Sequence, residues 1–195
     1  VSAHDEGALF PSESLLTNGD QPQVMDIVEI PVLKQMSDPL QPENWLIDKS
    51  KRWELKSDEY SLPDLNHCVD KVSHIWREPD GRNDRVSATS LSKVNLKRSI
   101  RLIHLPSIRV QFEWNVWDGE YKLRRRALFQ YNGVDYDLGL TDPIFIEKYR
   151  DKIPEKGQPS KVFAIRPRYG CYLCVSLAPE FNGYHYKVVA TILEG

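Results

Sequence analysis

The stretch FEWNVWDGEYKLRRR, residues 112–126, holds an Asp-Gly pair between two runs in which apolar and polar residues alternate. An Asp-Gly pair favours a type I′ turn because both central positions of that turn need a positive φ, and the flanking alternation is typical of strands. The stretch therefore predicts a β-hairpin with a two-residue loop at positions 118 and 119. The expected cross-strand pairs are Trp117 with Glu120, Val116 with Tyr121, Asn115 with Lys122, Trp114 with Leu123, and Glu113 with Arg124.

The hairpin has two unlike faces, because side chains alternate along a strand. The apolar face is expected to meet the core and holds Phe112, Trp114, Val116, Tyr121, Leu123, Ala127 and Phe129. The opposite face holds Glu113, Asn115, Trp117, Lys122, Arg124, Arg126 and Gln130. Proteins that stack single strands place rings and cations on the same surface, and here Trp117 alone shares the basic face. The stretch is thus predicted as a hairpin first, with its basic face as a candidate binding surface.

Other short strand-like runs accompany the hairpin in the second half of the chain. They are RSIRLIHL, VDYDLGL, KVFAIRPR, CYLCVSL and YKVVATIL, with one short helical candidate in TDPIFIEKYRDKI, residues 141–153. Regularly spaced strands with one short helix are typical of a small barrel of the oligonucleotide-binding (OB) type. The predicted fold class is mainly β with a few short helices, arranged as an OB-like β-barrel.

The first half of the chain differs from the second in pattern and in charge. Ser61 and Asp64 match a capping box, and apolar residues then recur at helical spacing, so residues 61–76 are predicted to form an amphipathic helix. The polar stretch after this helix is expected to divide the chain into two domains, residues 1–90 and 91–195. The first has nine Lys and Arg against seventeen Asp and Glu, a net charge of −8, and the second has seventeen against eleven, a net charge of +6.

The basic second half predicts a polyanionic partner, with nucleic acid as the first candidate. The candidate nucleic-acid-binding residues are Lys97, Arg98, Arg101, Trp117, Lys122, Arg124, Arg126, Arg166 and Arg168. Charge asymmetry does not say which partner neutralises it. Two alternatives therefore stay open: the basic half docks on the acidic half, or the protein is an interaction subunit that holds a protein partner through its acidic first half.

Catalytic signatures are missing from the sequence, so binding is favoured over catalysis and no cofactor is predicted. There is no phosphate-binding glycine loop, no G-x-S-x-G and no H-E-x-x-H. A metal-dependent nuclease built on Asp135, Asp137 and Asp142 is the remaining enzymatic alternative, because paired acids can hold Mg²⁺. Cys171 and Cys174 are three apart in a strand-like run, which sends them to opposite faces, and they are interpreted as structural thiols.

The composition predicts a cytoplasmic protein with no membrane partner. No apolar run approaches the ~20 residues that a membrane-spanning helix needs. Three cysteines are fewer than a secreted disulfide scaffold usually has, and an odd number cannot all pair within the chain. This favours a reducing compartment.

Several longer stretches resemble the prokaryotic dual OB-containing domain family. They are VMDIVEIPVL, then QPENWLID with Trp53 after it, RRRALFQYNGVDYDLGLTDP, and the closing YLCVSLAPEFNGYHYKVVATIL. The resemblance implies two OB-like units and nucleic-acid binding, in a family associated with biological conflict (defence) systems. Val1 and Ser2 resemble the end of a segment that follows the family's opening strands, so the first barrel is expected to lack those strands here.

Overall fold

The structure, a computed structural model, describes residues 1, 9–36, 38, 40–76, 82–93 and 96–195. The expected hairpin is confirmed: β7 (Ile108–Trp117) and β8 (Glu120–Tyr131) pair antiparallel in the register expected from the sequence. Asp118 and Gly119 have φ angles of 52° and 80°, the positive values that a type I′ turn needs. The turn chemistry therefore sets the register of this strand pair.

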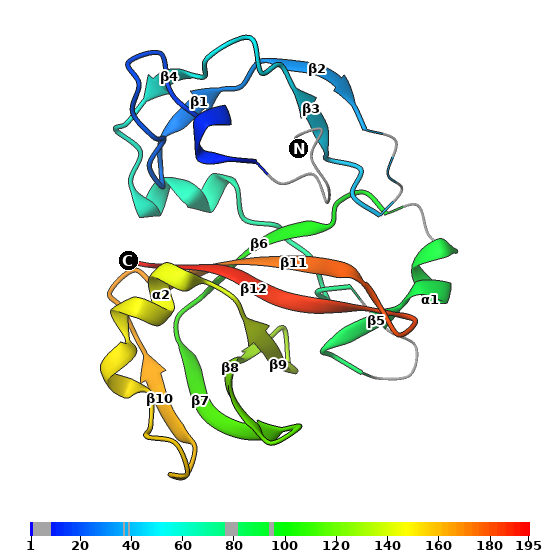
Figure 1. Ribbon diagram of the computed structural model, residues 1–195, viewed down its shortest axis with the longest axis vertical. Helices are drawn as coiled ribbons and strands as arrows, with labels where there is room; N and C mark the ends of the chain where they lie inside the picture. Colours follow the sequence, from blue (N-terminus) through cyan, green and yellow to red (C-terminus); the bar gives the residue numbers. More distant parts are fainter. Residues whose placement is uncertain (2–8, 37, 39, 77–81, 94–95) are drawn as a thin grey trace. The chain divides into compact units, whose positions relative to one another are not determined.

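Within the described part of the chain, an eight-stranded sheet forms around this hairpin (Figure 1). Its order is β10-β7-β8-β9-β12-β11-β6, and β5 pairs with β12 off this path. The β9 and β12 strands run parallel, and the other neighbours run antiparallel. The other bounds are β5 (Arg85–Ser87), β6 (Ile100–Leu105), β9 (Val134–Leu140), β10 (Lys161–Ile165), β11 (Cys171–Phe181) and β12 (Tyr184–Glu194).

The connections of this sheet follow the Greek-key order of an OB fold. Only Pro106 and Ser107 separate β6 from β7, so the two act as one bent strand that pairs with β11 at one end and β8 at the other. After the β7-β8-β9 meander the chain passes through α2 (Pro143–Lys148), and β12 returns parallel to β9. Among the described residues no pairing joins the two edge strands of this order, β10 and β6. The expected class, mainly β with short helices and OB-like, is confirmed.

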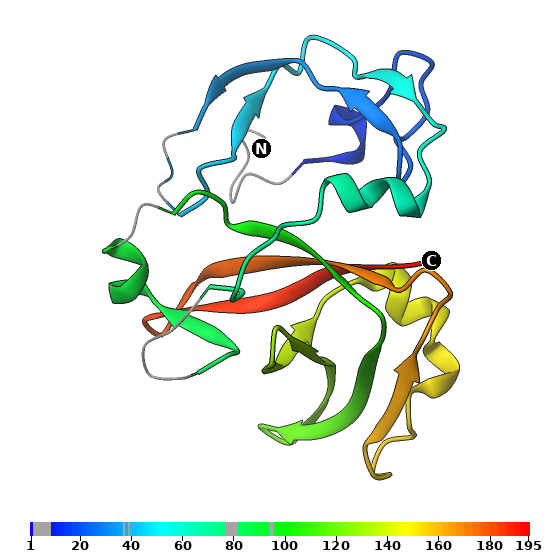
Figure 2. The same ribbon diagram turned by 180° about the vertical axis from the view of Figure 1, so that it is seen from behind.

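The core of the sheet is built from the alternate side chains of these strands. Fully or nearly fully buried members are Ile108, Val110, Phe112, Ala127, Leu138, Leu140, Leu173, Val175 and Val189. Both views show α2 beside β10 (Figures 1 and 2), and Phe145 of α2 is buried. Cys171 is buried as well, and this burial raises the pKa of its thiol to about 11, which keeps the thiol protonated. The interpretation of Cys171 as a structural thiol fits this environment.

The tip of the β7-β8 hairpin departs from the expected core face. Val116 is 62% exposed and Tyr121 is 44% exposed, although both lie on the same side as the buried Phe112. Pairing of β8 with β9 begins only at Arg126, and β10 reaches β7 only as far as Phe112. The tip therefore extends beyond its neighbouring strands, which leaves no core for its apolar side chains to enter.

The amphipathic helix predicted over residues 61–76 is wrong for most of its length. The capping pair is present, because the Ser61 N–H and hydroxyl both donate to Asp64 Oδ2, but only a 3₁₀ helix, η3 (Leu62–His67), follows. The next residues bond to the sheet instead: the Asp70 N–H donates to the Leu102 carbonyl, and the Leu102 N–H donates to Asp70 Oδ2. These tertiary hydrogen bonds replace the helical ones. Contacts with β6 therefore determine the conformation of this segment, despite its helical periodicity.

The chain divides into two compact units, Val1–Asp64 with Asn95–Ser99, and Leu65–Val94 with Ile100–Gly195. The boundary expected near residue 90 and the OB-like nature of the first part stay predictions; residues 77–81 of the expected boundary stretch lie outside the described residues.

In the first unit β1 pairs with β4 and β2 with β3, around a small core of Leu16, Ile47 and Trp53. Its elements are η2 (Pro11–Glu13), β1 (Ile27–Glu29), β2 (Val32–Gln35), β3 (Trp45–Ile47) and β4 (Glu54–Ser57). The short helices of the second unit not yet given are α1 (Ala88–Ser92) and η4 (Arg150–Lys152).

One glycine between β10 and β11 holds the chain close to β6. Gly170 has a φ of +77°, and an added Cβ would lie 2.5 Å from His104 Nε2 and 2.6 Å from the Leu105 carbonyl oxygen. We expect Gly170→Ala to lower the free energy of unfolding by about 2–4 kcal/mol, because backbone strain and overpacking add. The control is Gly183→Ala, with a φ of +80° and nothing within 4 Å of the added Cβ. Urea denaturation of both variants is the test, and equal losses would contradict the steric argument.

Candidate functional site

Cationic side chains gather on the side of β7 and β8 that faces away from the core. The alternation that buries Val110 and Ala127 points Arg109, Arg124 and Arg126 outward. We define the basic face as the outward cations of these strands together with Arg166, which directly follows β10. Its members are Arg109, Lys122, Arg124, Arg126 and Arg166.

Two acids partly neutralise this basic face. Arg126 Nε lies 2.6 Å from Asp137 Oδ1, and Arg126 also donates to the Asp137 carbonyl oxygen. One terminal nitrogen of Arg124 lies 3.4 Å from Glu113 Oε2, and the other lies 3.9 Å from Asp137 Oδ2. Asp137 therefore lies between two arginines and holds both of them near the β9 edge of the face.

The other cations of the basic face are less constrained. In the part of the chain that the structure describes, no ion pair involves Arg109, Lys122 or Arg166. Trp117 lies at the tip of the hairpin, on the same side as Lys122, and is 65% exposed. Three unpaired cations and one exposed ring therefore share a surface, and Trp117, Lys122 and Arg166 are among the candidate residues expected from the sequence.

Not all residues expected at the site lie together. Lys97 and Arg98 are exposed residues of the first unit, so the structure does not add them to the basic face. Arg101 is on β6, where its guanidinium lies 3.0 Å from Asp70 Oδ1 and 5.9 Å from the Trp76 ring. This ion pair is largely buried and structural. Arg168 is exposed and lies 5.2 Å from the ring of its neighbour Tyr169.

Two residues of interest are not among the candidate nucleic-acid-binding residues that the sequence suggested. Arg109 belongs to the basic face because it is four residues from Glu113 in β7, and residues an even number apart in a strand lie on the same face. The sequence could have shown this if the predicted strand had been extended back to residue 108. Phe181 is 64% exposed at the turn between β11 and β12. The Asn182-Gly183 pair that makes this turn, with φ angles of 51° and 80°, is the same hairpin signal as Asp118-Gly119.

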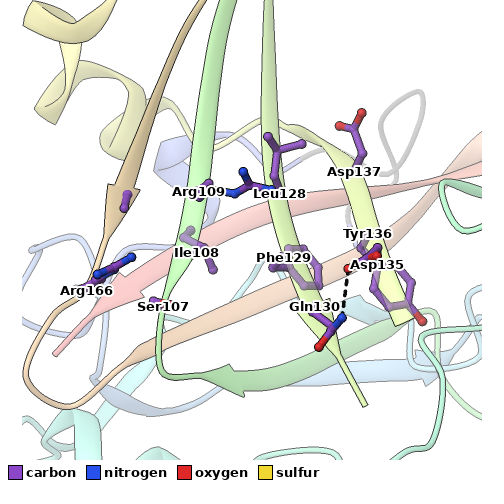
Figure 3. Close-up of a pocket in the computed structure, with 11 residues that line it drawn as sticks. Ser107, Ile108, Arg109, Leu128, Phe129, Gln130, Asp135, Tyr136, Asp137 and Arg166 are labelled. Atoms are coloured by element: carbon purple, nitrogen blue, oxygen red, sulfur yellow. Dashed lines mark hydrogen bonds between the residues drawn. The ribbon is translucent and has the colours of Figure 1, made fainter. Parts of the chain in front are cut away.

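A cavity of about 610 Å³ lies at the other end of the basic face, away from the hairpin tip (Figure 3). Arg109 and Arg166 border it on the side of β7 and β10, and Asp135 and Asp137 border it on β9. Leu128 lies between the two groups in the register of the sheet. The cavity thus has a cationic side and an acidic side.

The three acids of the alternative nuclease hypothesis each have different structural partners. Gln130 Nε2 donates to Asp135 Oδ1, and Asp137 binds the two arginines. Asp142 is buried, and its carboxylate accepts hydrogen bonds from the N–H groups of Ile144, Phe145 and Ile192. Among the residues that the structure describes, no group of three or more His, Cys, Asp or Glu could hold a metal ion. Likewise, no helix in the described ranges has the length and apolarity needed to cross a membrane.

Comparison with known proteins identifies the family. A family model described as the dual OB-containing domain matches residues 1–192. The chain therefore belongs to the dual OB-containing domain family. No curated protein and no solved structure matched the chain.

Proposed function

We propose that the second unit of this dual OB-containing protein binds single-stranded nucleic acid across the outward side of β7, β8 and β9. The observation that carries the proposal is the basic face itself: four cations on β7 and β8, Arg166 directly after β10, and the exposed Trp117 at one end. In OB folds the second and third strands and the loop between the first and second strands form the usual ligand surface. By the connectivity described above, these elements correspond to β8, β9 and the turn at Asp118.

The chemistry of the basic face suits a flexible polyanion. Long cationic side chains neutralise phosphates without reading sequence, and each neutralised phosphate makes binding more sensitive to salt. An exposed tryptophan stacks on any base, because every base has a π-face. Strand side chains at positions i and i+2 lie about 6.6 Å apart, so Lys122, Arg124 and Arg126 form a row that follows β8. This row supports contacts to successive phosphates of an extended strand.

The direct test is fluorescence anisotropy with labelled 12-nucleotide probes of single-stranded DNA, single-stranded RNA and duplex DNA, each at low and moderate salt. We expect the single-stranded probes to bind and their affinity to fall as salt rises. Failure of every probe to bind at low salt would contradict the proposal. Tight binding that does not respond to salt would contradict the role of the basic face.

Removing the carboxylate of Asp137 is expected to strengthen binding. Asp137→Asn releases Arg124 and Arg126 from ion pairs of the kind that are worth about 0.2–1 kcal/mol at a surface, so we expect an affinity gain of about twofold to tenfold at low salt. The matched control is Asp151→Asn in η4, which makes the same charge change away from the basic face. An equal gain in both variants would show that net charge alone, and not the release of these arginines, controls affinity.

A protein partner for the first unit is the second candidate function. The observation that favours it is the exposure of many large apolar side chains in this unit, with a net acidic charge in the first half of the chain. The exposed residues are Leu9, Phe10, Val24, Ile27, Ile30, Val32, Leu33, Trp45, Leu55 and Tyr60. The test is capture by the tagged protein and by its Leu33→Glu/Trp45→Glu variant. Retrieval of one protein by the wild type, lost in the variant, would support this role, and retrieval of none would contradict it.

A further inference from the structure

We infer that the cavity beside Arg109 is a subsite for one nucleotide, and that it favours guanine and rejects thymine and uracil. This inference rests on the proposed function, since it assigns a base preference to part of the same surface. The cavity volume of about 610 Å³ falls within the usual range of small-ligand pockets, about 300–1,000 Å³. It is therefore large enough for one nucleotide.

The order of charged groups across the cavity is complementary to a nucleotide. Ala164, Arg109, Leu128 and Asp137 lie side by side on β10, β7, β8 and β9, because the register pairs each with the next. Neighbouring strands are about 4.8 Å apart, so the strand that carries Arg109 and the strand that carries Asp137 are about 9.6 Å apart. A nucleotide that lies across these strands places its phosphate by Arg109 and Arg166 and its base toward β9.

The middle of the cavity suits the face of a base. Leu128 is half-buried and points outward between the cationic and acidic sides. Ala164, on the far side of Arg109 on β10, is small. Apolar side chains of this kind give a planar ring a surface to lie on without competing for its hydrogen-bonding edge. The polar edge of the base is then left to the side chains of the β8-β9 end.

The β8-β9 end of the cavity offers hydrogen-bond acceptors. Gln130 Nε2 donates to Asp135 Oδ1 over 3.2 Å, which fixes the amide and leaves Gln130 Oε1 as an acceptor (Figure 3). Asp135 is exposed, and an ionised carboxylate only accepts hydrogen bonds. Both groups line the cavity, so this end of the cavity presents carboxylate and amide oxygens to a ligand.

This arrangement discriminates between bases by their donors. Guanine carries a ring N–H and an amino group side by side, so it can donate to Asp135 and Gln130 together. Thymine and uracil carry a single N–H between two carbonyl oxygens, and those oxygens would face acceptors. Asp135 and Gln130 are exposed, so the discrimination comes from the loss of these paired contacts and from the repulsion between facing oxygens. Guanine is therefore the preferred base, and thymine and uracil are the least favoured.

The test compares two 12-nucleotide DNA probes by anisotropy, one all thymine and one with a single central guanine. We expect the guanine probe to bind the wild type at least about fivefold more tightly, the lower end of what a good bidentate base contact gives. Asp135→Asn, which replaces an acceptor with a donor, is expected to abolish this ratio. The matched control is Glu120→Gln, the same charge change at the hairpin end of β8, and it is expected to keep the ratio.

The outcomes separate this inference from the proposed function. Salt-sensitive binding of both probes with equal affinity would overturn the guanine subsite and leave the proposed function standing. A guanine preference that survives in Asp135→Asn would overturn the assignment of the subsite to this cavity. Binding of neither probe would overturn both proposals.

Discussion

Replacing Asp142 with alanine is expected to lower the free energy of unfolding by about 2–4 kcal/mol. Asp142 Oδ1 accepts from the N–H groups of Ile144 and Phe145, each over 3.0 Å, and thereby caps α2. Oδ2 accepts from the Ile192 N–H over 2.9 Å and ties this helix start to β12. The loss of an N-cap costs about 0.5–2 kcal/mol, and a buried N–H left without an acceptor costs about 1–3 kcal/mol more.

The comparison with Asp142→Asn isolates the contribution of the bond to β12. Asparagine keeps one oxygen that can cap α2, but its amide nitrogen cannot accept from Ile192. We therefore expect an intermediate loss, smaller than that of the alanine variant. Urea denaturation followed by tryptophan fluorescence gives both values. A loss below about 0.5 kcal/mol in the alanine variant, the size of an ordinary surface substitution, would contradict the structural role assigned to Asp142.

Simultaneous replacement of Arg109, Lys122 and Arg166 with alanine is expected to weaken binding of a single-stranded probe on the order of 100-fold at 0.1 M salt. Each lost phosphate contact removes about 0.7 from the slope of log affinity against log salt, and three such contacts account for this factor. These three cations are chosen because none forms an ion pair in the described part of the structure. Their removal therefore leaves no ion-paired acid without its partner.

The control for this variant makes the same charge change elsewhere. Lys34, Lys71 and Lys93 are exposed, are not members of the basic face, and form no ion pair in the described part of the structure. Their combined replacement with alanine is expected to weaken binding by less than about fivefold, because net charge acts at long range and is screened by salt. Similar losses in the two triple variants would mean that binding follows net charge and not the basic face.

The hairpin shows what the sequence determines most directly. Its register follows from one Asp-Gly pair, and its buried face follows from alternation, since both are local properties of the chain. The strand at residues 134–140 and the part of β11 at residues 171–177 were recognisable from alternation as well. The exposed tip was not, because the place where β9 and β10 stop pairing depends on strands distant in sequence.

The failed helix shows the opposite case. Residues 61–76 have a cap and a helical stripe, yet Asp70 bonds to Leu102 and the Ile75 N–H donates to the Tyr136 hydroxyl. Contacts between residues more than thirty positions apart determine the conformation of this segment. The periodicity of a single sequence does not reveal such contacts. The candidate site was predictable only in part. Alternation placed Lys122 and Arg124 on one face, whereas the position of Asp137 beside Arg124 and Arg126 depends on how β9 aligns with β8.

The salt dependence of binding tests the proposed interface most directly. The affinity of the wild type and of the Arg109→Ala/Lys122→Ala/Arg166→Ala variant for one single-stranded probe is measured from about 50 to 200 mM salt, the range over which phosphate contacts change affinity strongly. We expect the slope of log affinity against log salt to be shallower by about 2 in the variant. Equal slopes would mean that these cations do not contact phosphate, and the basic face would not be the nucleic-acid-binding surface.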